Sequence, residues 1–451
     1  MLEKMFKLKE NNTSFRTEVV AGLTTFMAMA YILAVNPNIL SATGMNSDAI
    51  LLATELASFV GCMAMALLAN YPFALAPGMG LNAYMAFTVC GNMGYSWQIA
   101  LLAVFVEGLI FIVLSLTNVR EAIFNAIPMA LKKGVSAGIG LFIAFIGLQG
   151  ANLVVNDDST LLTYVKFVGD FHTIGIGALL ALIGLFIIVV LHHKNIKGSI
   201  LIGILATWIL GMICEAIGLY VPDGKEFYSL YPTFRMIDFG AFGTTFGQCF
   251  NVDFSGVDIL NFIAVLFAFL FVDIFDTLGT LIGVSTKANM LDEEGKLPRI
   301  RPALLADAIA TSVGAIFGTS TTTTYVESSA GVAAGGRTGL SAMVTGLLFL
   351  LAIVFAPIFT AIPSFATAPA LIFVGFLMIS SIISIDFEDI TEAVPAYLAM
   401  LAMPLMYSIS EGIALGVISY VVINLCCGKA KKIKPLMYIL AVLFVLKYIF
   451  L

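Results

Sequence analysis

Two aspartates lie in the middle of a long apolar stretch, and they are the residues most able to do chemistry. Residues 259–286 form a run of 28 residues without Lys or Arg that contains Asp273 and Asp276. A run of this length predicts a membrane-spanning helix, since about 20 apolar residues cross the hydrocarbon core. A carboxylate at that depth costs at least ~2.5 kcal/mol and usually marks a substrate or ion path. Because the aspartates are three residues apart, they share one helix face.

Two other stretches predict broken helices. Residues 74–82 (ALAPGMGLN) begin with Pro and Gly, and residues 318–327 (GTSTTTTYVE) begin with β-branched threonines, so both starts are poor helix formers. We expect an extended piece followed by a half-helix in each. Such backbone is tolerated at membrane depth only where it lines a cavity or is buried in protein. Asn82 and Glu327 would lie at the N-termini of the half-helices. A helix N-terminus has free N–H groups and the positive end of the helix dipole.

Each of these patterns has a simpler interpretation. The aspartates could have a purely structural role and join helices by hydrogen bonds. Both broken stretches could be simple kinks, because Pro and Gly are frequent in membrane helices. Two broken stretches offset by 245 residues favour a binding site between two repeats instead. Among the other intramembrane acids, we expect Asp307 to lie behind the site and Glu107 to bind backbone or a Ser or Thr partner.

The composition predicts a polytopic helical membrane protein. Of 451 residues, 60% are hydrophobic and 11% are charged, whereas soluble proteins carry about 25% charged residues. His and Cys lack metal-ligand spacing, so we expect no metal and no cofactor. Basic patches with interleaved aromatic residues are missing, which excludes nucleic acid as a partner. Fourteen apolar segments are expected, at residues 17–39, 50–69, 74–90, 97–116, 134–150, 173–191, 198–219, 257–284, 303–317, 320–336, 339–360, 367–384, 394–408 and 410–427.

The basic residues predict the orientation. With the N-terminus in the cytoplasm, the inside segments hold 18 Lys and Arg residues and the outside segments hold 3. Seven spans repeated twice must be inverted repeats, the arrangement of secondary transporters. The N-terminus has no signal-peptide h-region, so we expect a multi-pass protein of the plasma (inner) membrane. Residues 435–451 would lie at the interface or pack on the bundle.

Four motifs carry a resemblance to a known family. They are FRTEVVAGLTTFMAMAYILAVNPNIL, ALAPGMGLNAYMAF, FVDIFDTLGTLIGVSTKANML and GTSTTTTYVESSAGVAAGGRTGL. From Phe15 to about Lys434 the chain resembles the AzgA-like purine permeases (guanine, hypoxanthine and adenine), a branch of the nucleobase–cation symporter-2, or xanthine-uracil permease, superfamily. The resemblance implies an all-α uracil-permease-like fold of 14 transmembrane segments as 7+7 inverted repeats, with two short strands in segments 3 and 10.

The resemblance also implies a division into core and gate domains. The expected ranges are a cytoplasmic N-terminus (1–16), a core domain (17–118 and 257–360), a gate domain (119–256 and 361–428), and a cytoplasmic basic segment with an apolar tail (429–451). A homodimer formed through the gate domain is compatible with related folds.

The site residues follow by motif position. Asp273 and Glu327 would be the main base contacts and Asn82 another. A carboxylate accepting two N–H groups suits the edge of a purine, and aromatic rings sandwich bases; the aromatic candidates are Phe26, Tyr31, Tyr84, Phe271, Phe275 and Tyr325. The predicted substrate-binding set is Gly80, Asn82, Phe271, Asp273, Tyr325, Glu327 and Ser328, with Thr25 and Asp307 behind it. A proton would be carried by Asp273, Asp276 or Glu327, because burial favours a neutral carboxyl. We favour Asp273, since the dipole at a half-helix N-terminus would favour the charged form of Glu327.

The predicted function is proton-coupled import of purine nucleobases, guanine or hypoxanthine first, by alternating access. An adenine-preferring permease is the alternative. An anion carrier on the same fold is less favoured, because the predicted centre has several acids and no Lys or Arg. An intramembrane aspartyl enzyme is disfavoured, because acids three apart on one helix poorly suit a shared-proton dyad. The expected partners are a purine, a proton and the lipid bilayer.

Overall fold

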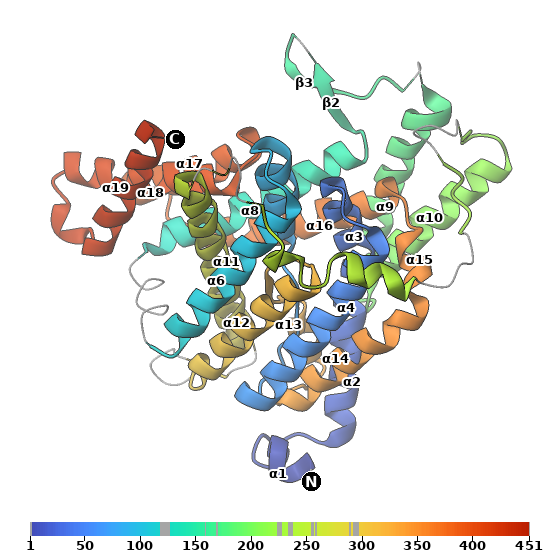
Figure 1. Ribbon diagram of the computed structural model, residues 1–451, viewed down its shortest axis with the longest axis horizontal. Helices are drawn as coiled ribbons and strands as arrows, with labels where there is room; N and C mark the ends of the chain where they lie inside the picture. The colour runs from blue at the N-terminus through green and yellow to red at the C-terminus, as the bar shows by residue number, and fades with distance from the viewer. Residues whose placement is uncertain are drawn as a thin grey trace.

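The computed structural model describes most of the chain and is built mainly of helices (Figure 1). The described residues are 2–117, 127–157, 159–167, 170–222, 228–232, 238–253, 257, 259–287, 290–291 and 297–450. The helices of the first half are α1 (Leu2–Phe6), α2 (Phe15–Met29), α3 (Ile32–Leu40), α4 (Ser47–Ala64), α5 (Met79–Ala83), α6 (Trp97–Ser115), α8 (Met129–Gly150), α9 (Ile176–His193) and α10 (Ser199–Ala216).

The second half follows the same pattern of long helices interrupted by a short strand. Its helices are α11 (Ile259–Lys287), α12 (Ile300–Phe317), α13 (Ser328–Ala333), α14 (Gly339–Ala352), α15 (Ala356–Thr360), α16 (Ser364–Ile379), α17 (Ile390–Leu405), α18 (Ile409–Cys426) and α19 (Pro435–Phe450). The strands of the chain are β1 (Leu75–Pro77), β2 (Val154–Asp157), β3 (Leu161–Tyr164) and β4 (Thr322–Thr324).

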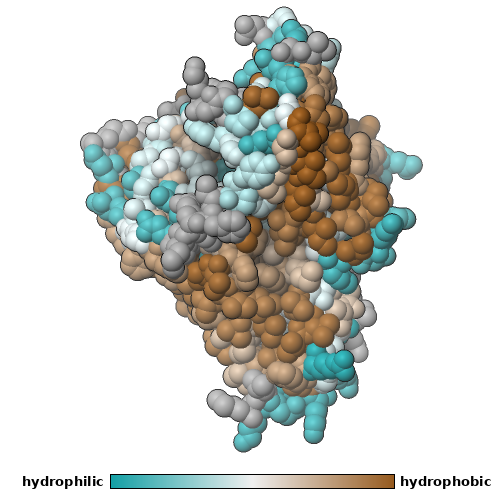
Figure 2. Space-filling model, turned by 90° about the vertical axis from the view of Figure 1, so that its right-hand side faces the viewer, coloured by the Kyte–Doolittle hydropathy of each residue, from teal (hydrophilic) through white to brown (hydrophobic). Residues whose placement is uncertain are grey.

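Within the described residues, ten helical stretches are long and apolar enough to cross a membrane. Three shorter apolar helices, Gly339–Phe355, Ile390–Leu405 and Pro435–Leu446, accompany them. Hydrophobic residues cover the middle of the face in Figure 2, and hydrophilic residues gather toward its ends. The all-α polytopic class is therefore confirmed, while the count of fourteen spans stays a prediction.

Helix ends follow from the local sequence. The side chains of Ser14, Asn46 and Ser96 accept hydrogen bonds from backbone N–H groups in the first turns of α2, α4 and α6, as N-capping residues do. Helix α12 ends at Gly318, whose φ of +100° is a left-handed conformation that favours glycine. An added Cβ there would lie 2.4 Å from Cβ of Thr245, so glycine also permits a close approach of residues 238–253, which precede α11 in the chain.

Segments 3 and 10 are broken, as predicted. Strands β1 and β4 pair antiparallel, with Leu75 opposite Thr324 and Pro77 opposite Thr322. Helix α5 begins at Met79, directly after β1, and continues as a π-helical stretch over Tyr84–Asn92. Helix α13 follows β4 after three residues. The strand pair thus places the starts of two half-helices, more than 240 residues apart in sequence, beside each other.

The long helices pack in two sets. In one set α2 packs against α13 and α14, and α12 against α4 and α6; in the other α8 packs against α16, α17 and α18, and α9 against α10 and α16. Figure 1 shows α12 and α13 between α6 and α4 in the view. The two sets use residues of the predicted core and gate domains, whose boundaries remain a prediction.

The C-terminal helix α19 packs on the bundle. It contacts α18, its Phe444 ring lies 5.9 Å from the ring of Phe267 on α11, and the hydroxyl of Tyr448 donates to Glu411 at the start of α18. This is one of the two placements expected for residues 435–451. Figure 1 shows α19 at the edge of the molecule, beside α18.

Candidate functional site

The paired strands β1 and β4, called the β1–β4 crossing below, are also joined by hydrogen bonds outside the strand ladder. The Gly78 N–H donates to Thr321 O at 2.9 Å, and the Tyr325 N–H donates to Ala74 O at 2.9 Å. The Tyr325 hydroxyl also donates to Pro77 O at 2.6 Å. The carbonyl of Pro77 is thus satisfied by a side chain. The ring of Tyr325 is therefore fixed at the point where the half-helix α5 begins.

Glu327 and Ser328 lie where segment 10 turns from strand to helix. Glu327 is partly exposed, and its Oε1 accepts a hydrogen bond of 2.6 Å from the hydroxyl of Tyr31. Ser328 is buried, and its Oγ accepts the Ala74 N–H at 3.0 Å. Ser328 thus joins the two broken segments, and Glu327 presents a carboxylate beside them.

Asp276 reaches the same crossing from α11. It is partly exposed, and its Oδ2 accepts a hydrogen bond of 3.3 Å from the hydroxyl of Thr323 on β4. A Cβ added at Gly78 would lie 3.3 Å from that oxygen. Asp276 is also within electrostatic range of Glu327 and Asp307. Two partly exposed carboxylates, one from α11 and one from segment 10, therefore converge on one place.

Asp273 lies deeper than Asp276. It is fully buried, and its Oδ1 is 2.9 Å from the hydroxyl oxygen of Thr277. The same hydroxyl is 3.0 Å from Oδ1 of Asp307 on α12, which is fully buried as well. The structure therefore brings Asp307 to Asp273 through a single hydroxyl.

Asn82 faces the loop that leads into β4. It is fully buried, and its Oδ1 accepts a hydrogen bond from the hydroxyl of Ser320. Its Nδ2 has no partner among the residues that the structure describes. Gly80 lies on another side of α5, since a Cβ there would be 2.8 Å from Cγ2 of Ile139 on α8. Asn82 thus keeps a spare donor, whereas Gly80 permits close packing on α8.

Two predicted residues lie on other sides of their helices. The ring of Phe271 is 4.8 Å from that of Phe267 and 6.2 Å from that of Phe444, so Phe271 faces α19. Thr25 lies against α13, because a Cβ added at Gly331 would be 2.1 Å from its hydroxyl oxygen. Thr25 therefore belongs to the packing of segment 10 on α2.

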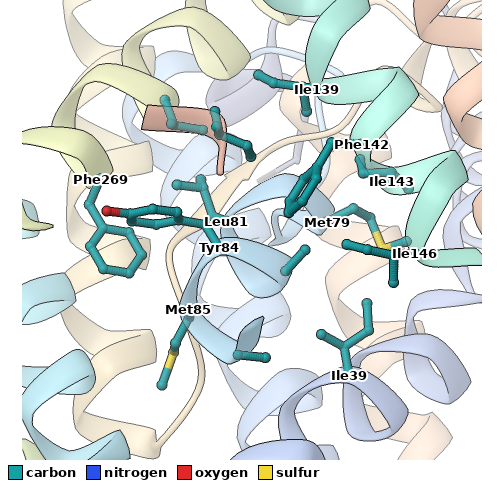
Figure 3. Close-up of a cluster of buried hydrophobic side chains, with 14 of the residues drawn as sticks. Ile39, Met79, Leu81, Tyr84, Met85, Ile139, Phe142, Ile143, Ile146 and Phe269 are labelled. Carbon is teal, nitrogen blue, oxygen red and sulfur yellow. The ribbon is translucent and has the colours of Figure 1, made fainter. Parts of the chain in front are cut away.

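The face of α5 toward α8 is apolar (Figure 3). The ring of Tyr84 meets the ring of Phe269 edge-on at 4.9 Å, and Met79 lies next to Ile143 and Ile146 of α8 (Figure 3). The side chain of another aromatic candidate, Phe275, lies outside the described residues. Hydrocarbon on one side and carboxylates on the other would suit a flat, hydrogen-bonding ligand.

Several polar residues at the site escape sequence reasoning. Tyr31 is proposed there only as an aromatic face, yet its hydroxyl holds Glu327. Thr277 is a hydroxyl residue within an apolar helix, and Ser320 belongs to a run of Ser and Thr residues. Neither residue type by itself indicates a binding site in the sequence. Glu107 binds the hydroxyl of Thr321 at 2.7 Å, as expected of it. An acid or tyrosine in a long apolar run is the one signal that could direct attention to such positions.

Two pockets lie apart from this crossing. One of about 600 Å³ is lined at the ends of α8 and α17 by residues that include Lys132, Asp389 and Glu392. Another of about 580 Å³ is lined by residues that include Tyr71 and Arg299. Neither lining contains a predicted site residue. In the part of the chain that the structure describes, no cluster of His, Cys, Asp and Glu could hold a metal ion.

The sequence matches known proteins over nearly its full length. Residues 16–415 match a family model described as a permease family. The chain belongs to this permease family. It is 46% identical over 459 residues to the guanine/hypoxanthine permease PbuG of Bacillus subtilis (strain 168), covering 100% of both proteins. It is 42% identical over 450 residues to the adenine permease AdeP of Escherichia coli (strain K12), covering 100% of this chain and 96% of that protein.

A solved structure shows the same fold. The transmembrane domain of the cyanobacterial bicarbonate transporter BicA superposes with a TM-score of 0.64 at 16% identity, covering 89% of this chain and 97% of that domain. This permease therefore has a fold known from membrane transporters, and the resemblance stated from the motifs is confirmed. Permeases are not enzymes, which excludes the aspartyl-enzyme alternative.

Proposed function

We propose that this permease is a secondary active transporter that imports purine nucleobases, with guanine or hypoxanthine preferred. The observation that carries the proposal is the 46% identity to a guanine/hypoxanthine permease over the whole of both chains. The 42% identity to an adenine permease favours adenine as the second candidate. The protein would lie in the plasma membrane with its N-terminus in the cytoplasm and a homodimer compatible with its fold.

The base would bind at the β1–β4 crossing. Asp276 and Glu327 are partly exposed acceptors from two different elements, and the N–H groups of a purine edge would donate to them in charge-assisted bonds. Asn82 Nδ2, a buried donor without a partner among the described residues, would meet an acceptor atom of the base. Leaving such a donor unpaired costs about 1–3 kcal/mol, so a ligand acceptor would stabilise the site.

Proton coupling would use Asp273 and Asp307. The Thr277 hydroxyl lies at 2.9 and 3.0 Å from one oxygen of each acid, but a hydroxyl has only one hydrogen to donate. When one of the two carboxyls is protonated, it can donate to the hydroxyl oxygen while the hydroxyl donates to the other carboxylate, and both contacts are then full hydrogen bonds. This pair therefore suits storage of a proton, which supports Asp273 as the predicted carrier.

Alternating access would move the core domain against the gate domain. The half-helix α5 contacts α8, on which Ile139 lies against Gly80, so the proposed site abuts the proposed gate. An anion carrier of the same fold is disfavoured, because Asp276 and Glu327 would repel an anion.

Uptake by purified protein in proteoliposomes tests the function. Vesicles with an inwardly directed proton gradient, acidic outside, should accumulate labelled hypoxanthine. Collapse of that gradient should abolish the accumulation. Competition by unlabelled guanine and adenine ranks the purines. The proposal fails if the vesicles neither take up nor exchange any purine.

A further inference from the structure

Residues near both ends of α2 make hydrogen bonds to segment 10 and the turn that follows it. Near the start of α2, the fully buried carboxylate of Glu18 accepts the Arg337 N–H at 2.8 Å and the Ser341 hydroxyl at 2.6 Å. Just beyond the end of α2, the Tyr31 hydroxyl donates to Glu327 at 2.6 Å. The stretch that carries Glu327 is thus attached near both ends of α2, at Glu18 and at Tyr31.

Helix α13 also approaches α2 closely between these two points. A Cβ added at Gly331 would lie 2.1 Å from Thr25 Oγ1 and 2.6 Å from Ala21 O. A contact this close leaves no room for α13 to slide along α2. The close packing of α13 on α2 therefore holds Tyr31 and Glu327 in a defined relative position in this structure.

The Tyr31 hydroxyl can act on Glu327 in two ways. Tyr31 is only 1% exposed, so its O–H has no competing water, and a bond from O–H to a carboxylate is among the stronger hydrogen bonds. It fixes the side chain of Glu327 with Oε1 occupied. The other oxygen, Oε2, can still accept from a ligand, since each carboxylate oxygen has acceptor capacity of its own.

We propose that Tyr31 is a positioning residue of the base site, which holds Glu327 so that Oε2 accepts an N–H of the purine. This inference rests on the proposed function, because it takes the purine as the ligand of Glu327. Tyr31 would act through Glu327, and its ring would not be the surface that stacks on the base.

The test compares hypoxanthine uptake by wild-type protein and Tyr31→Phe in proteoliposomes. Losing a hydrogen bond to a charged group should raise KM at least about tenfold, while the maximal rate stays within about twofold of wild type, because the half-helices and the gate are untouched. Tyr71→Phe is the matched control. It removes one hydroxyl from a tyrosine that is 2% exposed and whose oxygen accepts the Arg299 N–H away from the crossing, so its KM should not change.

Three outcomes overturn the proposal. They are a Tyr31→Phe KM within about twofold of wild type, a fall in maximal rate at unchanged KM, and loss of folded protein by size exclusion while Tyr71→Phe remains folded. The last two would assign Tyr31 a purely structural role. Failure of the proposed function itself is distinguished by the wild-type vesicles, which would then show no purine uptake.

Discussion

Burial divides the acids of the site into two kinds. Asp276 and Glu327 keep exposed surface at the β1–β4 crossing, whereas Asp273 and Asp307 are fully buried around the Thr277 hydroxyl. A partly exposed carboxylate can accept from a ligand, whereas Asp273 and Asp307 each lie within hydrogen-bond distance of the same buried hydroxyl. We therefore propose that binding and proton coupling use neighbouring but different carboxyls.

Glu327→Gln should reduce purine uptake to less than about a tenth of wild type at a base concentration near the wild-type KM. Glutamine keeps the shape but removes the charge, and a hydrogen bond to a charged group contributes ~1.5–3 kcal/mol. Labelled uptake in cells, normalised to the amount of protein in the membrane, measures the effect. Glu10→Gln is the control, since Glu10 is exposed and pairs only with Lys7 at 3.0 Å among its described contacts. Unchanged uptake by Glu327→Gln would remove Glu327 from the site.

Asp307→Asn and Thr277→Val should uncouple the transporter. Either change prevents the two carboxyls from sharing a proton, so uphill accumulation should fall toward a ratio of about 1. Exchange of internal for external base should continue, because exchange needs no net proton movement. At 100 mV, one co-transported charge is worth about 2.3 kcal/mol, or roughly 50-fold in accumulation, which makes the loss easy to detect.

Gradient-driven uptake measured beside counterflow in proteoliposomes checks this uncoupling. Ser312→Ala is the matched control on α12, because its hydroxyl bonds only Ala308 O of its own helix among the described contacts at 3.0 Å. Thr277→Ser keeps the hydroxyl and should keep coupling. Normal accumulation by Thr277→Val would show that the proton travels elsewhere, with Glu327 and Asp276 the next candidates.

At the scale of elements, the site depends on how closely segment 10 packs on α2. Two strands of three residues each form the crossing, too few to be stable without support. That support comes from α2, which contacts α13 and α14, and from Glu107 of α6, which binds Thr321. The half-helices are thus held in place by the long helices around them.

Gly331→Ala should destabilise the protein by about 1–3 kcal/mol, the usual cost of overpacking. The new Cβ would lie 2.1 Å from Thr25 Oγ1 and 2.6 Å from the backbone oxygen of Ala21, and backbone cannot move aside cheaply. Gly150→Ala is the control at the end of α8, where an added Cβ meets no atom within 4 Å. Thermal unfolding in detergent should show a lower midpoint for Gly331→Ala only; equal midpoints would mean that α2 and α13 are less tightly packed than the structure indicates.

At the scale of the whole molecule, the fold and the family both indicate a membrane transporter. The superposition on a bicarbonate transporter at 16% identity shows that this fold tolerates very different sequences. The substrate must therefore be decided by the residues of the binding site rather than by the fold, and we propose that these are the residues at the β1–β4 crossing. The orientation depends on the 18 to 3 asymmetry of Lys and Arg.

Cysteine labelling in intact cells should show Gly218→Cys as accessible and Gly428→Cys as shielded from an impermeant thiol reagent. The two positions are well matched, since each has φ above +70° and no atom within 4 Å of an added Cβ. The native thiols, including Cys426 and Cys427, must be replaced first. Labelling of Gly428→Cys but not Gly218→Cys would invert the predicted topology.

The sequence by itself determined the apolar segments, the two broken ones and the acids within them. These features depend on local properties: the length of apolar runs, the helix-breaking effect of Pro77 and the threonines, and the cost of a carboxylate in hydrocarbon. They led to the two broken segments and the acids near them, whereas the short strands of segments 3 and 10 and the family were implied by the resemblance that the four motifs carry.

Only the tertiary structure decided which side chains meet. Helix periodicity places Asp273 and Asp276 on one face but does not say which neighbour that face contacts. In the structure, Asp273 meets Asp307 through the Thr277 hydroxyl, and Asp276 lies at the β1–β4 crossing. The structure also shows that the ring of Phe271 faces Phe444 of α19. Tyr31 binds Glu327 across 296 residues of chain, a contact that no local pattern encodes because it exists only once α2 and α13 have packed together.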